Sequence, residues 1–190
     1  MDDFPATRAA IQERFEAAVR ELNAALGELS AGELVRPGAV GEWSLKDTLA
    51  HLSSTWLAGQ LEAYLDGRTP TAATTFGFDD PPPPGTDLAT NDGRNAWLHT
   101  SEARLTLPEV RERYEEFLRR TNAAIARLPE DDFGRAFALA PLGHVGQLRP
   151  AVEGDGPPIV PLWRWLAGNT WHHFEEHLPA FQAAAAVAQG

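Results

Sequence analysis

The chain has 190 residues, of which 43% are hydrophobic, and this size and composition predict one globular domain spanning residues 1–190. The formal net charge of −11 argues against a nucleic-acid surface, because phosphate binding requires clustered lysines and arginines, and it equally disfavours an anionic membrane. No cysteine occurs, which excludes disulfides, thiolate metal ligands and cysteine nucleophiles, so any thiol chemistry needs a thiol from a co-substrate.

The first helix is expected between Pro5, which suits a first helical turn, and about Ser30. Apolar residues recur there at intervals of three or four, which is the stripe that a bundle helix buries. Glycines and a proline between Gly32 and Gly41 then predict a loop. The residues of the stripe are Ile11, Phe15, Val19, Leu22, Leu26 and Leu29.

The second helix has the clearest start in the sequence. Ser44 can cap the backbone, and Asp47, three residues later, can reach back in a variant of the capping box. This helix is expected to run to about Asp66, with Gly67 as its stop. His51 lies in its second turn, beside an apolar stripe of Leu45, Leu49, Leu52, Trp56 and Leu61.

Two long connections interrupt the helical pattern. Residues 68–92 show neither a helix nor a strand pattern, and the proline-rich segment 78–85 is expected to be stiff and polyproline-like. A connection this long is either a lid or interface element or a tolerated insertion. The second connection, residues 129–158, is also rich in glycine and proline and contains His144.

Helical segments are expected at residues 91–104, with Trp97 facing inward, and at 108–128, after a second capping-box signature. The last helix is expected to begin at Pro161, and Pro179 either kinks it or ends it before an alanine-rich segment. Four main helices without a convincing strand indicate an all-α four-helix bundle with two long irregular connections.

The last helix carries three of the six histidines. His173 and His177 are four residues apart, so both imidazoles lie on one helix face, where they can bind a single metal ion. The residue after His173 is Phe174, so the general-base glutamate of zinc proteases is missing and such a protease is not expected. Two histidines are too few for a stable site. The alternative to a metal site is a polar helix face with exposed imidazoles.

Other polar residues have two readings each. His51 taken alone is a packed or hydrogen-bonded histidine beside the core. Asp47, four residues before it, is a helix cap, or else an acceptor that orients a metal ligand or a group at the pocket mouth. His172 and Glu176 pair by the same spacing, and the carboxylate could also ligate. His99 and His144 lack partner spacing and are expected on the surface or in loops, although His144 could swing towards a site. Three of the six tryptophans, Trp56, Trp163 and Trp171, could line a pocket for an apolar ligand.

Two segments together resemble a known family. Residues 41–52, GEWSLKDTLAHL, and residues 169–181, NTWHHFEEHLPAF, resemble helix two and the last helix of the DinB/YfiT-like metalloprotein superfamily, and most closely its ClbS/DfsB four-helix-bundle branch. The resemblance implies a four-helix bundle with one divalent metal held by His51, His173 and His177. Imidazole ligands suit zinc or nickel, with iron or manganese as further candidates.

The resemblance implies several functions. Members of the superfamily include thiol-dependent transferases and isomerases, and the ClbS branch is associated with self-protection by hydrolysis of a reactive genotoxin. We therefore expect a metal-dependent hydrolase or thiol S-transferase that acts on a small reactive or xenobiotic molecule, with a low-molecular-weight thiol as a candidate co-substrate. The alternative is a non-catalytic protein that binds and sequesters its ligand.

The remaining expectations concern partners and location. A function on DNA is the weakest hypothesis, because of the charge of −11. Bundles of this kind often pair as homodimers, but no surface patch for such pairing is evident in the sequence. With no long apolar run and a polar N-terminus, the chain is expected to be cytoplasmic.

Overall fold

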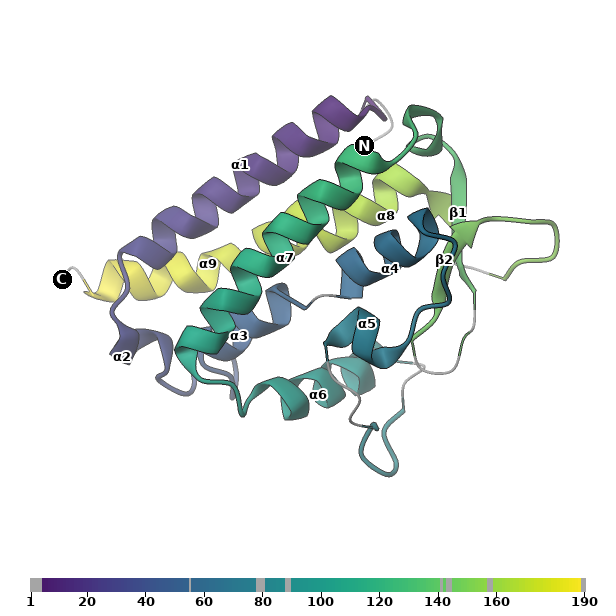
Figure 1. The fold of residues 1–190 in the computed structure, drawn as a ribbon. Coiled ribbons are helices and arrows are strands. Elements are labelled where there is room, and N and C mark those ends of the chain that lie inside the picture. The colour runs from purple at the N-terminus through teal and green to yellow at the C-terminus, as the bar shows by residue number, and fades with distance from the viewer. Residues whose placement is uncertain are drawn as a thin grey trace.

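The computed structural model describes residues 5–54, 56–77, 81–87, 90–140, 142, 145–156 and 159–188. It is mostly helical with one small sheet, which confirms the expected helical bundle (Figure 1). The elements are α1 (Arg8–Gly27), α2 (Ala31–Leu34), α3 (Leu45–Leu52), α4 (Trp56–Leu65), α5 (Ala72–Phe76), α6 (Asn91–Glu102), α7 (Leu107–Arg127), a 3₁₀ turn (Glu130–Asp132), β1 (Ala136–Ala140), β2 (Gln147–Pro150), β3 (Ile159–Pro161), α8 (Leu162–Asn169) and α9 (Trp171–Ala188).

Four helical segments form the bundle: α1, α3 followed by α4, α7, and α8 followed by α9 (Figure 1). Helices α5 and α6 lie along one side, and the strands lie at the end of the bundle near α4 and α8. Among the described residues, no helix is long and apolar enough to cross a membrane.

The predicted helix starts are confirmed at α3 and α7. Asp47 Oδ2 accepts hydrogen bonds from the Ser44 backbone N–H at 3.0 Å and from its hydroxyl at 2.7 Å. Glu109 Oε2 accepts from the Thr106 N–H at 2.7 Å in the same way. These side chains satisfy backbone donors that the first turn leaves without partners, so they fix where each helix begins.

Two helices that were expected to be continuous are divided. The second helix stops after Leu52 and resumes at Trp56, and the last helix is interrupted at Thr170, where φ is −127° and ψ is −103°. At each break a hydroxyl donates to a carbonyl four residues earlier, Ser53 to Leu49 and Thr170 to Leu166, both at 2.7 Å. Such bonds compete with the regular backbone pattern.

The last helix continues through Pro179 to Ala188, so the expectation that it could end at this proline is wrong. Proline costs one backbone hydrogen bond inside a helix. The segment that follows is rich in alanine, the residue with the highest helix propensity, and this favours continuation of the helix.

The main core is organised around aromatic rings that join three helices. Phe174 of α9 packs at 5.8 Å from Phe15 of α1 and at 6.2 Å from Phe117 of α7, measured between ring centroids. Phe15 and Phe117 meet edge to face at 6.2 Å. All three side chains are at most 1% exposed. A second, smaller cluster lies apart and contains Phe76, Trp97, Leu98 and Val145.

The second connection contains a sheet, so the expectation of a wholly irregular segment at 129–158 is wrong. Strand β1 lies between β2 and β3 and pairs antiparallel with both, with Phe137 opposite Pro150 and Val160. The buried Gln60 of α4 fixes β2: its Oε1 accepts from the Leu148 N–H at 2.9 Å. Strands this short, rich in alanine and proline, lack the alternation that identifies a strand in sequence.

The first connection also differs from the expectation, because it contains the short helix α5. Its Thr71 cap accepts from the Thr74 N–H at 3.3 Å. Of the proline-rich segment, residues 78–80 lie outside the described part of the chain, and residues 81–85 are neither helix nor strand. The role of this segment as a lid or an insertion stays a prediction.

Replacing Phe174 by alanine is expected to lower the free energy of unfolding by about 3–5 kcal/mol, because the cavity would lie between α1, α7 and α9. Urea denaturation measures this. Val187→Ala, in the same helix at a 76% exposed position, serves as the control and should change stability by less than about 0.5 kcal/mol. Equal losses in both variants would contradict the proposed core.

Candidate metal centre

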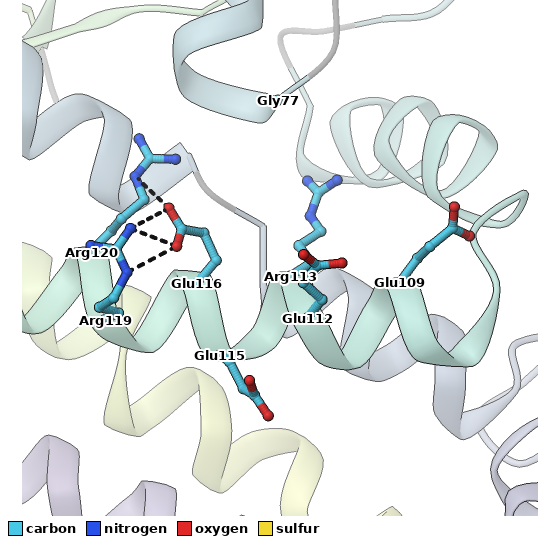
Figure 2. A pocket seen from close by; sticks show the side chains of 8 residues that line it. All are labelled: Gly77, Glu109, Glu112, Arg113, Glu115, Glu116, Arg119 and Arg120. Atoms are coloured by element: carbon cyan, nitrogen blue, oxygen red, sulfur yellow. Dashed lines mark hydrogen bonds and ion pairs between the residues drawn. The ribbon is translucent and has the colours of Figure 1, made fainter.

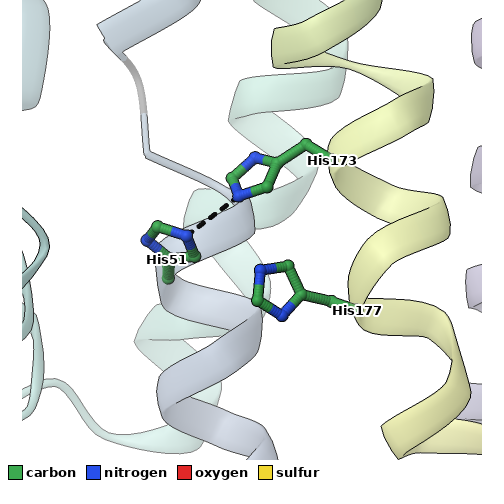
Figure 3. Close-up of side chains that lie close together, drawn as sticks. All are labelled: His51, His173 and His177. Carbon is green, nitrogen blue, oxygen red and sulfur yellow. Dashed lines mark hydrogen bonds between the residues drawn. The ribbon is translucent and has the colours of Figure 1, made fainter. Parts of the chain in front are cut away.

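Three histidines that are distant in the sequence come together between α3 and α9 (Figure 3). One ring nitrogen from each of His51, His173 and His177 lies within 4.8 Å of the other two. Nε2 of His51 and Nε2 of His173 are 2.9 Å apart. The ring centroids of His173 and His177 are 5.2 Å apart, as expected for neighbours one turn apart on a helix.

The helix breaks lie next to these histidines. His51 is in the last turn of α3, just before the break at Ser53, and His173 is in the first turn of α9, just after the break at Thr170. The hydroxyl bonds at Ser53 and Thr170 close the helix ends there. The breaks therefore set the direction of the two turns that carry facing imidazoles.

Burial keeps the three imidazoles neutral. It lowers the pKa of His51 to about 4, with His177 and His99 acting in the same direction. It lowers the pKa of His173 to about 3, helped by His51 and His177. The pKa of His177 is also lowered by burial, although Glu176 opposes the change. Neutral imidazoles offer lone pairs, which is the form that binds metals.

The spacing of the three nitrogens fits a metal ion. Two nitrogens bound to one zinc ion at about 2.0–2.1 Å can be at most roughly 4.2 Å apart, so small ring rotations suffice to bring all three into range. Without a metal ion, the Nε2 atoms of His51 and His173 are close enough to share one hydrogen bond. The donor set can thus hold a divalent cation, and three imidazoles leave further coordination positions open.

A model of the DinB superfamily matches residues 14–177 of the sequence. The chain belongs to the DinB superfamily. Its fold is also similar to the solved structure titled "Sibling Lethal Factor Precursor - DfsB", with a TM-score of 0.58, 18% identity, and coverage of 96% of this chain and 93% of that chain. At this identity the similarity shows the fold alone. No curated protein matches the sequence.

The other candidate residues that the structure describes in this DinB protein lie outside the three-histidine cluster. Asp47 acts as the cap of α3 and also contacts Lys46, whose Nζ lies 3.1 Å from Asp47 Oδ1. His172 packs against Trp171 with ring centroids 5.5 Å apart, and Glu176 is exposed. His144 lies outside the described residues.

The tryptophan named as a pocket candidate in α4, Trp56, packs against Trp165 of α8 at 5.5 Å between ring centroids. Its indole Nε1 donates to the Val145 carbonyl at 3.4 Å. Both tryptophans are half-buried. They form an aromatic pair that joins α4, the second half of one divided helical segment of this DinB bundle, to α8, the first half of the other.

Sequence reasoning missed His99, which was expected on the surface without a partner. Its ring stacks on Trp43 at 4.6 Å with an interplanar angle of 4°, and Trp43 packs edge-on against His51 at 5.5 Å. The residues come from α6, from the loop before α3, and from α3. No sequence spacing links α6 to α3, so only the packing of the two helices could show this contact.

A charged groove of about 560 Å³ lies away from the histidines, between the end of α5 and α7 (Figure 2). It is lined by Gly77 and by charged residues of α7 from Glu109 to Arg120. Each of its three arginines is paired with a glutamate at 2.6–2.9 Å. Apart from Gly77, the lining side chains are all charged, whereas a typical small-molecule site is lined mainly by hydrophobic and aromatic side chains.

The metal-free protein should lose stability as the pH falls below about 6.5. The histidines of the unfolded chain are protonated near that pH, whereas in the folded chain the pKa is about 4 for His51 and about 3 for His173. The loss is on the order of 3 kcal/mol for each imidazole. Urea denaturation between pH 7.5 and 4 measures it. The double variant His51→Gln, His173→Gln should show a flatter pH profile; an unchanged slope would contradict the buried, neutral cluster.

Proposed function

We propose that this chain is a divalent-metal-dependent enzyme that acts on a small reactive or xenobiotic molecule, by hydrolysis or by transfer of a low-molecular-weight thiol. The observation that supports the proposal most directly is the convergence of three neutral imidazoles from α3 and α9 in a DinB-superfamily chain. Such a set binds a cation without a protein charge that would neutralise it, so the centre stays electrophilic.

His51, His173 and His177 would hold the metal, and nitrogen ligands favour zinc or nickel over iron or manganese. A bound divalent metal lowers the pKa of a water or thiol and so supplies a nucleophile at neutral pH. Of the chain's own residues, Trp43 packs against the His51 ring, with ring centroids 5.5 Å apart. The absence of cysteine means that a thiol nucleophile would have to come from a co-substrate.

A non-catalytic, ligand-sequestering function is the second candidate, and one contact favours it. Asp47, the carboxylate four residues before His51, is engaged by Ser44 and Lys46 instead of being available as a general base. Catalysis by proton transfer would then depend on another group. Under this hypothesis the half-buried pair of Trp56 and Trp165 provides an apolar surface for a ligand.

Purified protein is expected to bind about one zinc or nickel ion per chain, and His51→Ala should abolish tight binding because two ligands on one helix are too few. Metal analysis after dialysis measures the stoichiometry. At a free metal concentration about 100-fold above the Kd, binding should add about 2.7 kcal/mol to the free energy of unfolding.

His172→Ala is the matched control, since this imidazole is next to His173 in the sequence but outside the cluster. It should keep the full metal content. A wild-type protein that binds no divalent metal, or a His51→Ala variant with unchanged stoichiometry, would refute the proposed centre.

The reaction can be tested with zinc-loaded protein and a panel of small electrophiles, with and without a low-molecular-weight thiol. Turnover that disappears in His173→Ala is expected, with the thiol dependence separating transfer from hydrolysis. Binding of an electrophile without product, retained in His173→Ala, would instead support the sequestering function.

A further inference from the structure

We propose that Trp43 and His99 are positioning residues for the metal ligand His51. Their stacked rings hold the His51 imidazole in the orientation that presents Nε2 to the other two histidines. The inference rests on the proposed metal-binding function, and it assigns a role to two residues that are not ligands themselves.

The first observation is that His51 lacks the usual orienting contact. A metal-binding histidine normally donates its second ring N–H to a carboxylate, carbonyl or water, which fixes the ring. In the described part of the chain, His51 Nδ1 is buried and has no hydrogen-bond partner, while Nε2 faces His173 at 2.9 Å. Among the described residues, packing is therefore the contact that can restrict rotation of this ring.

Trp43 supplies that restriction by packing. Its ring meets the His51 ring edge to face, with centroids 5.5 Å apart and planes at 68°. An indole packed this closely restricts the space in which the imidazole can rotate. Aromatic pairs in this geometry contribute about 0.5–1.5 kcal/mol beyond the area that they bury.

The backbone of Trp43 is itself fixed by a tight turn. The Trp43 N–H donates to the Val40 carbonyl at 3.0 Å, and the Val40 N–H donates back to the Trp43 carbonyl at 3.1 Å. Gly41 within this turn has φ of 60°, a conformation that favours glycine. Ser44 then caps α3 directly, so the indole and His51 are attached to one rigid unit.

His99 in turn packs against a face of the indole. It stacks on Trp43 at 4.6 Å, with the two ring planes almost parallel, and its Nε2 lies 4.0 Å from Asp47 Oδ2. Helix α6 is placed against α3 by Lys46, whose Nζ donates to the carbonyls of Ala103 and Leu105 at 3.0 and 2.8 Å. His99 therefore comes from a helix whose end is anchored to the first turn of α3.

These contacts make zinc affinity sensitive to residues that do not touch the ion. Loss of a partner that orients a ligand typically weakens metal affinity about 10–100-fold. Trp43→Leu should therefore weaken zinc binding by about tenfold, and His99→Ala by a smaller factor. His99→Phe, which keeps a ring on the indole but cannot pair with Asp47, should restore nearly the wild-type Kd.

The experiment is a zinc competition titration against a chromophoric chelator, combined with the visible absorption of the cobalt-substituted protein. The spectrum reports the geometry of the bound ion, which a merely structural role of Trp43 would not change. Trp165→Leu is the matched control: this tryptophan is also half-buried and packs against another ring, Trp56. It should leave the Kd and the cobalt spectrum unchanged.

Each outcome decides the inference. Weaker zinc binding in Trp43→Leu and His99→Ala, with recovery in His99→Phe, supports it. An unchanged Kd in both loss variants, or an equal loss in Trp165→Leu, overturns it while the proposed function stands. If Trp43→Leu does not fold, the two His99 variants decide alone. The His99 side chain is 31% exposed, so its replacement should leave the fold intact. A wild-type protein that binds neither zinc nor any other divalent metal overturns the proposed function and this inference together.

Discussion

The constraint on which this structure depends is the placement of three uncharged imidazoles against one another in a partly buried interface. Burial makes protonation unfavourable at His51 and His173, and proximity adds to this effect. A cluster of this kind is stable only if neighbouring packing keeps the rings from turning towards solvent. The bundle meets that requirement through the rings of Phe15, Phe117 and Phe174, which fix α9 against α1 and α7.

Much of the fold could be predicted from the sequence because the relevant signals are local. The capping residues at Ser44 and Thr106 and the apolar stripes located the helices that begin there. The breaks at Ser53 and Thr170 could not be predicted in the same way. Serine and threonine are common inside helices, and a hydroxyl bond to a carbonyl interrupts a helix only where tertiary packing favours it.

The histidine cluster could likewise be predicted only in part from local sequence signals. The spacing of His173 and His177 reveals a shared helix face, but His51 joined them only through resemblance to a family, because the contact spans more than a hundred residues of sequence. The stack of His99 on Trp43 has no local signature at all. The strands of the second connection were also missed, since their pairing partners and the anchoring Gln60 lie elsewhere in the chain.

The small apolar cluster makes the two long connections depend on each other for burial of their apolar side chains. Phe76, Trp97 and Leu98 come from the first connection and the helix after it, whereas Val145 comes from the second. Each connection therefore covers apolar surface of the other. A chimera that exchanged only one of them with a relative would expose unmatched apolar side chains, so the two connections form a single module for transplantation between members of the superfamily.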